Sequence, residues 1–181
     1  MAQEIETKIL DVDEDVLARK LLELGAKKIQ ETKLTIDWYQ PKGLIKDQQP
    51  PWFLRIRTSS EGKSEVTWKS WPKQVGIVKE VKEINFPVKS GQPVAELFEA
   101  IGLEKYAYQE KYRTSWQYED WRFDLDRYPG VPAYLEIEGR DEQHLIQAIK
   151  LLGLENHRAV SEGERTLIQN EYRLDWYNMR F

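Results

Sequence analysis

The chain has 181 residues, no cysteine and a formal charge of −4, from 27 Lys and Arg against 31 Asp and Glu. This length suits one domain with its own apolar core, and the mixed charge signs argue against a broad nucleic-acid-binding surface. The absence of cysteine excludes disulfides, thiolate catalysis and Cys-based metal sites, and no apolar run approaches the roughly 20 residues of a membrane-spanning helix.

Alternating polar and apolar residues predict eight strands, because successive side chains of a strand point to opposite faces. The predicted strands cover residues 3–10, 28–40, 52–59, 63–71, 78–88, 106–118, 121–128 and 133–139. Turn residues at 59–64 and 118–120 connect two strand pairs tightly, whereas residues 40–51 form a longer irregular loop.

Three helices are predicted between these strands, each with a polar start signal and a glycine stop signal. They lie between Asp13 and Gly25, between Ser90 or Gly91 and Gly102, and between Asp141 and Gly153. A fourth helix is predicted over residues 164–175.

Charged residues gather on one face of most predicted strands and are grouped by sign. The carboxylate pairs are Glu4 with Glu6, Asp124 with Asp126, and Glu136 with Glu138; the cation pairs are Arg55 with Arg57, and Lys111 with Arg113. A charged face in contact with water is the simplest interpretation of one such strand. Same-face neighbours two residues apart are only about 7 Å from each other and repel when their charges match, so a solvated face more usually mixes the signs.

Ligands would make these pairs favourable. A divalent cation stabilises two nearby carboxylates, and phosphate oxygens stabilise paired Arg and Lys side chains. Eight strands are also enough to close a barrel. A closed sheet with its charged face inward would bring acids, cations, a metal ion and a polyanion into one channel.

The order of these residues along the chain is a further signal. It begins with Glu4-x-Glu6-x-Lys8 and continues with Arg55-x-Arg57, Lys69, Glu83, Lys111-x-Arg113, the Asp124 and Asp126 pair and Glu136-x-Glu138. This series resembles the CYTH domain of the triphosphate tunnel metalloenzymes, which include class IV adenylyl cyclases, thiamine triphosphatases and tripolyphosphatases. Asn85 departs from the pattern, because the family often has a further acid two residues after the Glu83 position.

The resemblance implies an α+β fold in which an eight-stranded antiparallel β-barrel closes into a tunnel with a charged interior, flanked by three to four helices. It implies a single domain over residues 1–181, with residues 160–181 as a C-terminal helical and aromatic segment.

The resemblance also implies roles for the charged residues. Mg²⁺ or Mn²⁺ would be held by Glu4, Glu6, Glu136 and Glu138. Phosphates would be bound by Lys8, Arg55, Arg57, Lys69, Lys111 and Arg113. Lys8 and Glu6 would take part in catalysis, with Glu83, Asp124 and Asp126 in supporting positions.

Two chemistries compete within this family. A hydrolase directs water at the terminal phosphorus, whereas a cyclase sets the ribose 3′-hydroxyl against the α-phosphorus and must hold a nucleoside. The Glu136-x-Glu138 pair, and the lack of the His-Phe pair that some cyclases carry before the first Glu, favour a metal-dependent triphosphatase. Its substrate would be tripolyphosphate, a nucleoside triphosphate or another organic triphosphate.

Two alternatives stay open. One is a class IV adenylyl cyclase that converts ATP to cyclic AMP and pyrophosphate; the other is a non-catalytic module that binds polyphosphate or triphosphate ends. Trp52, Trp68, Trp71, Trp116 and Trp121 are candidates for stacking on a base, although core or rim positions are the simpler interpretation.

The expected partner is a small-molecule triphosphate, with no membrane, and the expected state is a monomer or homodimer. The N-terminus lacks the basic and apolar regions of a signal peptide, so the expected location is the cytoplasm.

Overall fold

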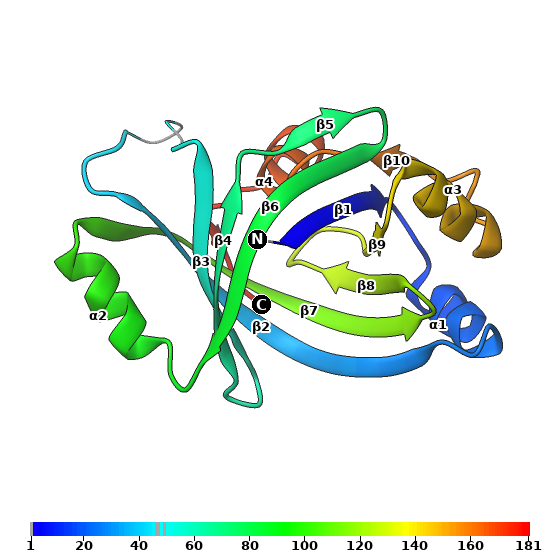
Figure 1. Cartoon of the computed structure of the whole chain (residues 1–181), viewed down its shortest axis with the longest axis horizontal. Helices are drawn as coiled ribbons and strands as arrows, with labels where there is room; N and C mark the ends of the chain where they lie inside the picture. The colour runs from blue at the N-terminus through cyan, green and yellow to red at the C-terminus, as the bar shows by residue number, and fades with distance from the viewer. Residues whose placement is uncertain (1, 46–47, 49) are drawn as a thin grey trace.

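Eight antiparallel strands form a closed barrel with helices on its outside, as the tunnel interpretation predicts (Figure 1). The structure is a computed structural model that describes residues 2–45, 48 and 50–181. Part of the loop predicted at 40–51 therefore lies outside the described residues.

Strand β1 (Ala2–Ile9) closes the barrel because it pairs along both of its edges. One edge pairs with β9 (Tyr134–Gly139) and the other with β6 (Val78–Val88). The strands between them follow the order β8 (Trp121–Arg127), β7 (Leu103–Tyr118), β2 (Lys27–Pro41), β3 (Trp52–Ser59) and β4 (Ser64–Ser70). The eight predicted strands are all confirmed.

Three short strands extend this barrel. They are β5 (Lys73–Val75) beside β6, β10 (Ala159–Val160) beside β1, and β11 (Asn178–Met179) beside β7. The β11 pairing with β7 is parallel, whereas the other two are antiparallel.

The helices begin where the sequence predicts. Helix α1 (Glu14–Glu23) starts after Asp13, and α3 (Glu142–Leu151) starts after Asp141; both aspartates accept a backbone N–H of the first turn. Helix α2 (Gln92–Ala100) has a proline in its first turn. No helix in the described part of the chain is both long and apolar enough to cross a bilayer.

The fourth helix is shorter than predicted. Helix α4 (Glu164–Thr166) continues only as a π-helical turn over Leu167–Glu171, so the helical region ends four residues before the expected residue 175. Arg173 then adopts a left-handed backbone conformation with φ of 57°, which a helix does not accommodate.

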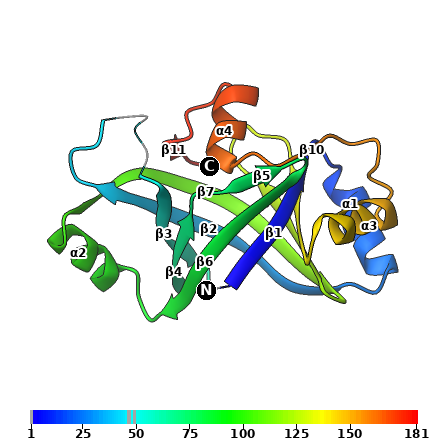
Figure 2. The same cartoon turned by 45° about the horizontal axis from the view of Figure 1, so that its top comes forward.

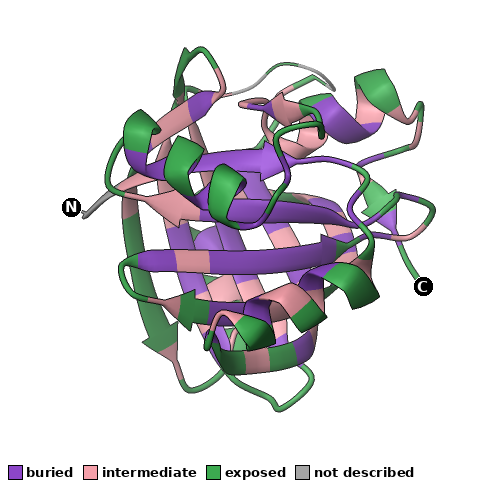
Figure 3. Ribbon diagram, turned by 90° about the vertical axis from the view of Figure 1, so that its right-hand side faces the viewer, coloured by how far each residue is buried: buried purple, intermediate pink, exposed green. Residues whose placement is uncertain are grey.

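The helices cover the barrel from outside. Helices α1 and α3 lie together at one end and bury Leu21 and Leu145 against the barrel residues Phe123 and Ile137 (Figures 1 and 3). Helix α2 lies at the other end and packs Phe98 against β2, β3 and β4. The outward residues of the strands therefore form the apolar core of the protein on these faces.

The C-terminal segment supplies a second apolar cluster. Leu167, Ile168 and Trp176 pack against Ile36 and Trp38 of β2. In Figure 2, α4 and β11 lie together on one side of the barrel, near β5 and β7. Ile36 lies opposite Gln109 and Arg57 in the strand register, so this apolar part of β2 faces the barrel interior.

The packing of α3 yields a stability prediction. Leu145 is fully buried between α3 and the barrel, whereas Leu151 on the same helix is partly exposed. We expect Leu145→Ala to lower the free energy of unfolding by about 2–5 kcal/mol, because it removes buried methyl groups and leaves a cavity. Leu151→Ala is the matched control, with an expected loss below about 1 kcal/mol. Urea denaturation of both variants measures the difference, and equal losses would contradict this packing.

Candidate functional site

A cavity of about 650 Å³ occupies the barrel interior. All eight barrel strands and the C-terminal segment contribute to its lining. A smaller cavity of about 400 Å³ shares Glu4, Glu83, Arg122 and Glu138 with it. These four charged residues therefore lie where the two cavities meet.

Strand register explains why the charges share this space. Residues directly opposite each other in an antiparallel pair place their side chains on the same face. Glu6 lies opposite Glu138 of β9 on one edge and opposite Lys79 of β6 on the other. Lys8 lies opposite Glu136. Because the barrel is closed, the charged positions predicted from both ends of the chain meet inside it.

The four glutamates predicted to hold metal divide between two groups. Glu4, Glu6 and Glu138 each offer a carboxylate oxygen within 4.8 Å of the others. Glu136 belongs instead to a second group of this kind with Asp126 and Glu164. The structure thus brings three of the four predicted ligands together and places the fourth beside different partners.

The first group carries negative charge that its surroundings do not fully compensate. Burial and the neighbouring carboxylates of Glu4 and Asp124 raise the pKa of Glu138 to about 8. Burial and the charge of Glu6 also raise the pKa of Glu4. Three carboxylates that converge and repel one another in this way suit a hard divalent cation, which takes oxygen ligands. The residues present therefore fit a Mg²⁺ or Mn²⁺ site.

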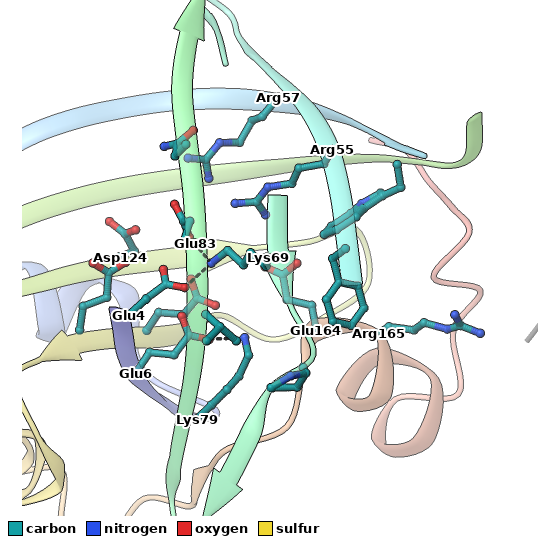
Figure 4. A pocket seen from close by; sticks show the side chains of 18 of the residues that line it. Glu4, Glu6, Arg55, Arg57, Lys69, Lys79, Glu83, Asp124, Glu164 and Arg165 are labelled. Carbon is teal, nitrogen blue, oxygen red and sulfur yellow. Dashed lines mark hydrogen bonds and ion pairs between the residues drawn. The ribbon is translucent and has the colours of Figure 1, made fainter. Parts of the chain in front are cut away.

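Lysines neutralise part of this group (Figure 4). Glu6 Oε1 accepts hydrogen bonds from Lys79 Nζ at 2.6 Å and from Lys8 Nζ at 3.0 Å. Lys69 forms ion pairs with Glu4 and with Glu83. Burial raises the pKa of Glu6, but Lys79 and Lys8 outweigh it and hold that pKa well below its usual range.

Arg113 organises the second carboxylate group. Its guanidinium donates to Asp124 and Asp126, each at 2.6 Å, and also to Glu136. Burial lowers the pKa of Arg113, but these three carboxylates raise it well above the usual value. Lys111 lies next to this network and donates to Asp126 at 2.8 Å. Two of the predicted phosphate-binding cations are therefore already held by several carboxylates.

Arg55 and Arg57 differ from these cations. Arg57 Nε donates to Glu65 at 2.6 Å, but its Nη1 has no hydrogen-bond partner. Among the described residues, no carboxylate lies within ion-pair distance of Arg55, which is only 9% exposed, and its Nε is also without a partner. The Arg55 guanidinium lies over the Trp38 ring, 5.4 Å from its centroid. Buried donors without an acceptor indicate a place for an anion.

The structure adds charged residues that the sequence analysis missed. Lys79 shares a strand face with Glu83, so the same alternation would have revealed it. Arg122 likewise precedes Asp124 on the inward face of β8 and donates to it at 3.1 Å. Glu164 accepts from Lys111 at 2.8 Å, but it lies in the C-terminal segment, where strand alternation gives no signal.

The five tryptophans considered for base stacking lie in different places. Trp71 lines the cavity. Trp116 and Trp121 are buried between the barrel and helices α1 and α3. Trp52 and Trp68 are half-buried and do not line the cavity.

The chain belongs to the CYTH domain family, which matches residues 2–167. Solved structures support the fold. The PH1012 protein from Pyrococcus horikoshii is 24% identical with a TM-score of 0.71, covering 86% of this chain and 94% of that one. A putative adenylate cyclase from Vibrio parahaemolyticus is 13% identical with a TM-score of 0.73, covering 93% and 99%.

A third similar structure is a putative adenylyl cyclase from Hippeastrum, described as having a dominant triphosphatase activity. It is 14% identical with a TM-score of 0.66, and the match covers 93% of this chain and 96% of that one. At these identities the likeness establishes the shared fold. No curated protein matches the chain in sequence.

The raised pKa of Glu138 makes cation binding dependent on pH. Below about pH 8 this carboxyl is protonated in the metal-free protein, whereas a cation binds its ionised form, so binding releases about one proton. We expect the affinity for Mg²⁺ or Mn²⁺ to fall by up to about tenfold for each pH unit below that pKa. Glu138→Gln should flatten this dependence. Calorimetric titration in buffers of different ionisation enthalpy counts the protons released.

Glu110 offers a matched control for this titration. Hydrogen bonds from Lys33 and from the backbone N–H of Phe181 lower its pKa to about 2, so it stays ionised across the range tested. Glu110→Gln should keep the wild-type pH dependence. An affinity that is constant between pH 6 and 8 in the wild-type protein would contradict the prediction.

Proposed function

We propose that the protein is a divalent-metal-dependent triphosphatase that hydrolyses a phosphoanhydride bond of a small-molecule triphosphate. The observation that carries this proposal is the pair of buried guanidinium groups of Arg55 and Arg57, each with an unpaired donor, in the same cavity as the Glu4, Glu6 and Glu138 carboxylates. A polyanion that brings its own divalent cation satisfies both groups at once.

Different residues of the cavity bind different parts of the substrate. Arg55 and Arg57 bind oxygens of the phosphate chain, because planar guanidinium groups donate two parallel hydrogen bonds to such groups. Lys69 lies between the guanidiniums and the carboxylates, bonded to Glu4 and Glu83, and can turn to a phosphate once those carboxylates bind metal. This arrangement neutralises charge along the chain of phosphates, which is the main requirement of phosphoryl transfer.

The remaining predicted residues act around the reacting end. Glu4, Glu6 and Glu138 would hold the Mg²⁺ or Mn²⁺, which when bound neutralises phosphate charge and activates a water molecule. Burial lowers the pKa of Lys8, but Glu6 and Glu136 raise it above its usual value, so its amino group stays protonated. Lys8 does not line the cavity, so in this proposal it acts by holding the Glu6 carboxylate, to which it donates at 3.0 Å. Arg113 and Lys111 support it by fixing Glu136 and Asp126.

Family membership and one structural neighbour support this function. The Hippeastrum protein is described as having a dominant triphosphatase activity, although it is also named a putative adenylyl cyclase. A cyclase acting on ATP is therefore the second candidate. The two differ in product, because hydrolysis releases phosphate whereas cyclisation releases pyrophosphate and cyclic AMP.

Product analysis with a site variant tests the proposal. With Mg²⁺ or Mn²⁺, we expect purified protein to release phosphate from tripolyphosphate or a nucleoside triphosphate. Glu6→Gln should reduce the rate by at least about a hundredfold, because it removes a central carboxylate of the cation site. Glu31→Gln, on the outside of β2, is the control. Cyclic AMP with pyrophosphate would identify the cyclase, and no turnover of any triphosphate would leave a binding module.

Arg55 allows binding and stability to be separated. We expect Arg55→Met to weaken binding of a metal–triphosphate complex at least about tenfold, through the loss of charged hydrogen bonds. The same change should lower the free energy of unfolding of the ligand-free protein only slightly. Burial lowers the pKa of Arg55, but the charges of Glu164 and Glu83 raise it above its usual value, so the guanidinium is partly compensated without an ion pair. Calorimetry and urea denaturation measure the two effects, with exposed Arg19→Met as control. Loss of stability with unchanged binding would sink this role for Arg55.

A further inference from the structure

Four aromatic side chains line one end of the interior cavity: Trp38, Phe53, Trp71 and Trp176. Phe53 and Trp71 stack with their ring centroids 5.6 Å apart and an interplanar angle of 13°. Trp38 contacts Phe53 edge to face at 6.4 Å and Trp176 at 5.3 Å. We call these four residues the aromatic wall.

Hydrogen bonds to Gln109 and Pro51 hold three residues of the aromatic wall. Gln109 is fully buried; its side-chain oxygen accepts from Trp38 Nε1 at 2.7 Å, and its side-chain nitrogen donates to the Trp176 carbonyl at 2.7 Å. The Trp71 backbone N–H donates to the Pro51 carbonyl at 3.1 Å. The bond to Gln109 fixes the Trp38 ring, and the backbone bonds hold the segments that carry Trp176 and Trp71, which lowers the entropy cost of binding a ligand.

The residues of the aromatic wall differ in their exposure to solvent. Trp38 and Trp176 are buried, and they pack in the apolar cluster of the C-terminal segment. Trp71 is 51% exposed although it is stacked on Phe53. The exposed half of the Trp71 indole stays in contact with water at the edge of the charged cavity. A flat ligand stacked on it would bury this apolar surface, which is favourable.

The aromatic wall lies next to Arg55, which is proposed to bind phosphate. The Arg55 guanidinium lies 5.4 Å from the centroid of the Trp38 ring. Phe53 precedes Arg55 by two residues, so both point to the same side of β3. A group attached to a phosphate chain held at Arg55 therefore lies beside the aromatic rings.

The charges near the wall select among flat groups. Arg55 stacks on Trp38, and the guanidinium of Arg165 lies 5.7 Å from the centroid of the Trp176 ring. Two positive charges against these rings disfavour a third on the ligand. A neutral ring suits this end of the cavity better than a cationic one.

We propose that the aromatic wall binds the neutral heteroaromatic ring of an organic triphosphate, so that the preferred substrate is a nucleoside triphosphate rather than inorganic tripolyphosphate. This inference rests on the proposed binding of triphosphate in the cavity. Stacking on aromatic side chains accepts any flat base, so the wall favours the class of nucleotides and not one base. Trp176 lies beyond residue 167, where the match to the CYTH family ends.

Binding of two non-hydrolysable ligands tests the proposal: β,γ-methylene ATP and the bis-methylene analogue of tripolyphosphate, each with Mg²⁺. We expect the wild-type protein to bind the ATP analogue more tightly. Trp71→Ala should raise the Kd of the ATP analogue about tenfold more than that of the tripolyphosphate analogue, because one stacking surface is lost. Trp71→Phe keeps a ring and should restore most of the difference.

Trp68→Ala is the matched control, because Trp68 is a half-buried tryptophan of β4 that does not line the cavity. It should leave the ratio of the two Kd values unchanged. An equal effect of Trp71→Ala on both ligands, or no effect on either, would overturn the proposal. Circular dichroism establishes that each variant is folded.

A third ligand separates neutral from cationic rings. The β,γ-methylene analogue of thiamine triphosphate carries a positively charged ring, and we expect it to bind more weakly than the ATP analogue under the same conditions. Tighter binding of the thiamine analogue would overturn the preference for a neutral ring. Because these measurements need no turnover, the two proposals can fail separately. Binding of ATP that depends on Trp71, without hydrolysis, would disprove the triphosphatase activity but support nucleotide binding by the aromatic wall. Hydrolysis of tripolyphosphate, with no effect of Trp71→Ala on ligand binding, would support the activity and disprove nucleotide binding by the wall.

Discussion

The pairing of β1 along both of its edges is the constraint on which the rest of the structure depends. It closes the sheet, so every second residue of the eight barrel strands must point into an enclosed space. Charges in that space have lost most of their hydration, and each one requires a partner or a ligand. Glu6 illustrates the result, because β1 sets it between Glu138 on one neighbouring strand and Lys79 on the other. Closure therefore turns an amphipathic strand pattern into a dense set of ion pairs.

The ion pairs differ in how readily they can be exchanged. Arg113 donates to three carboxylates from β8 and β9 and holds them in fixed positions, since a planar guanidinium bonded on several sides cannot turn away from one acceptor alone. Lys69 and Lys79 instead reach Glu4 and Glu6 on flexible side chains that each end in a single amino group. One half of the barrel thus acts as a rigid scaffold. In the other half, the lysine side chains can leave their glutamate partners with little movement of the backbone, as the proposed function requires.

Strand alternation predicted the eight strands and their charged faces, and the resemblance to the CYTH family implied that they close into a barrel with those faces inward. Alternation succeeded because a period of two residues fixes the face of a side chain once the strand is closed into a barrel. The same alternation places Lys79 on the face of Glu83, because the two residues are four positions apart on β6. Alternation could not show that Glu136 and Glu138 belong to different carboxylate groups, because both face inward. That difference depends on Arg113 of β7, which binds Glu136.

The C-terminal segment marks the limit of that reasoning. The interior positions of β2 are apolar at Ile36 and Trp38, because this segment folds back and covers them, and no periodicity reports such a long-range contact. The same segment brings Glu164 to Lys111 and Trp176 to Trp38. Its fourth helix was predicted too long for a related reason, since the left-handed turn at Arg173 lets the chain reverse and bring β11 to β7.

The interior thus has a charged part made by the barrel strands together with Glu164, and an aromatic part completed by Trp176. The charged part lies within residues 2–167, which the CYTH family shares, whereas Trp176 lies outside them. Gln109 joins the two parts: it stands two residues before Lys111 on the inward face of β7, yet its amide bonds both Trp38 and the backbone of Trp176. A change in the C-terminal segment can therefore alter what the aromatic end accepts while the ion pairs around Arg113 stay in place. Under the proposed function, this separation would let one charged barrel serve different triphosphates. The aromatic end, which would contact the group that distinguishes them, lies against a segment that the barrel does not need for closure.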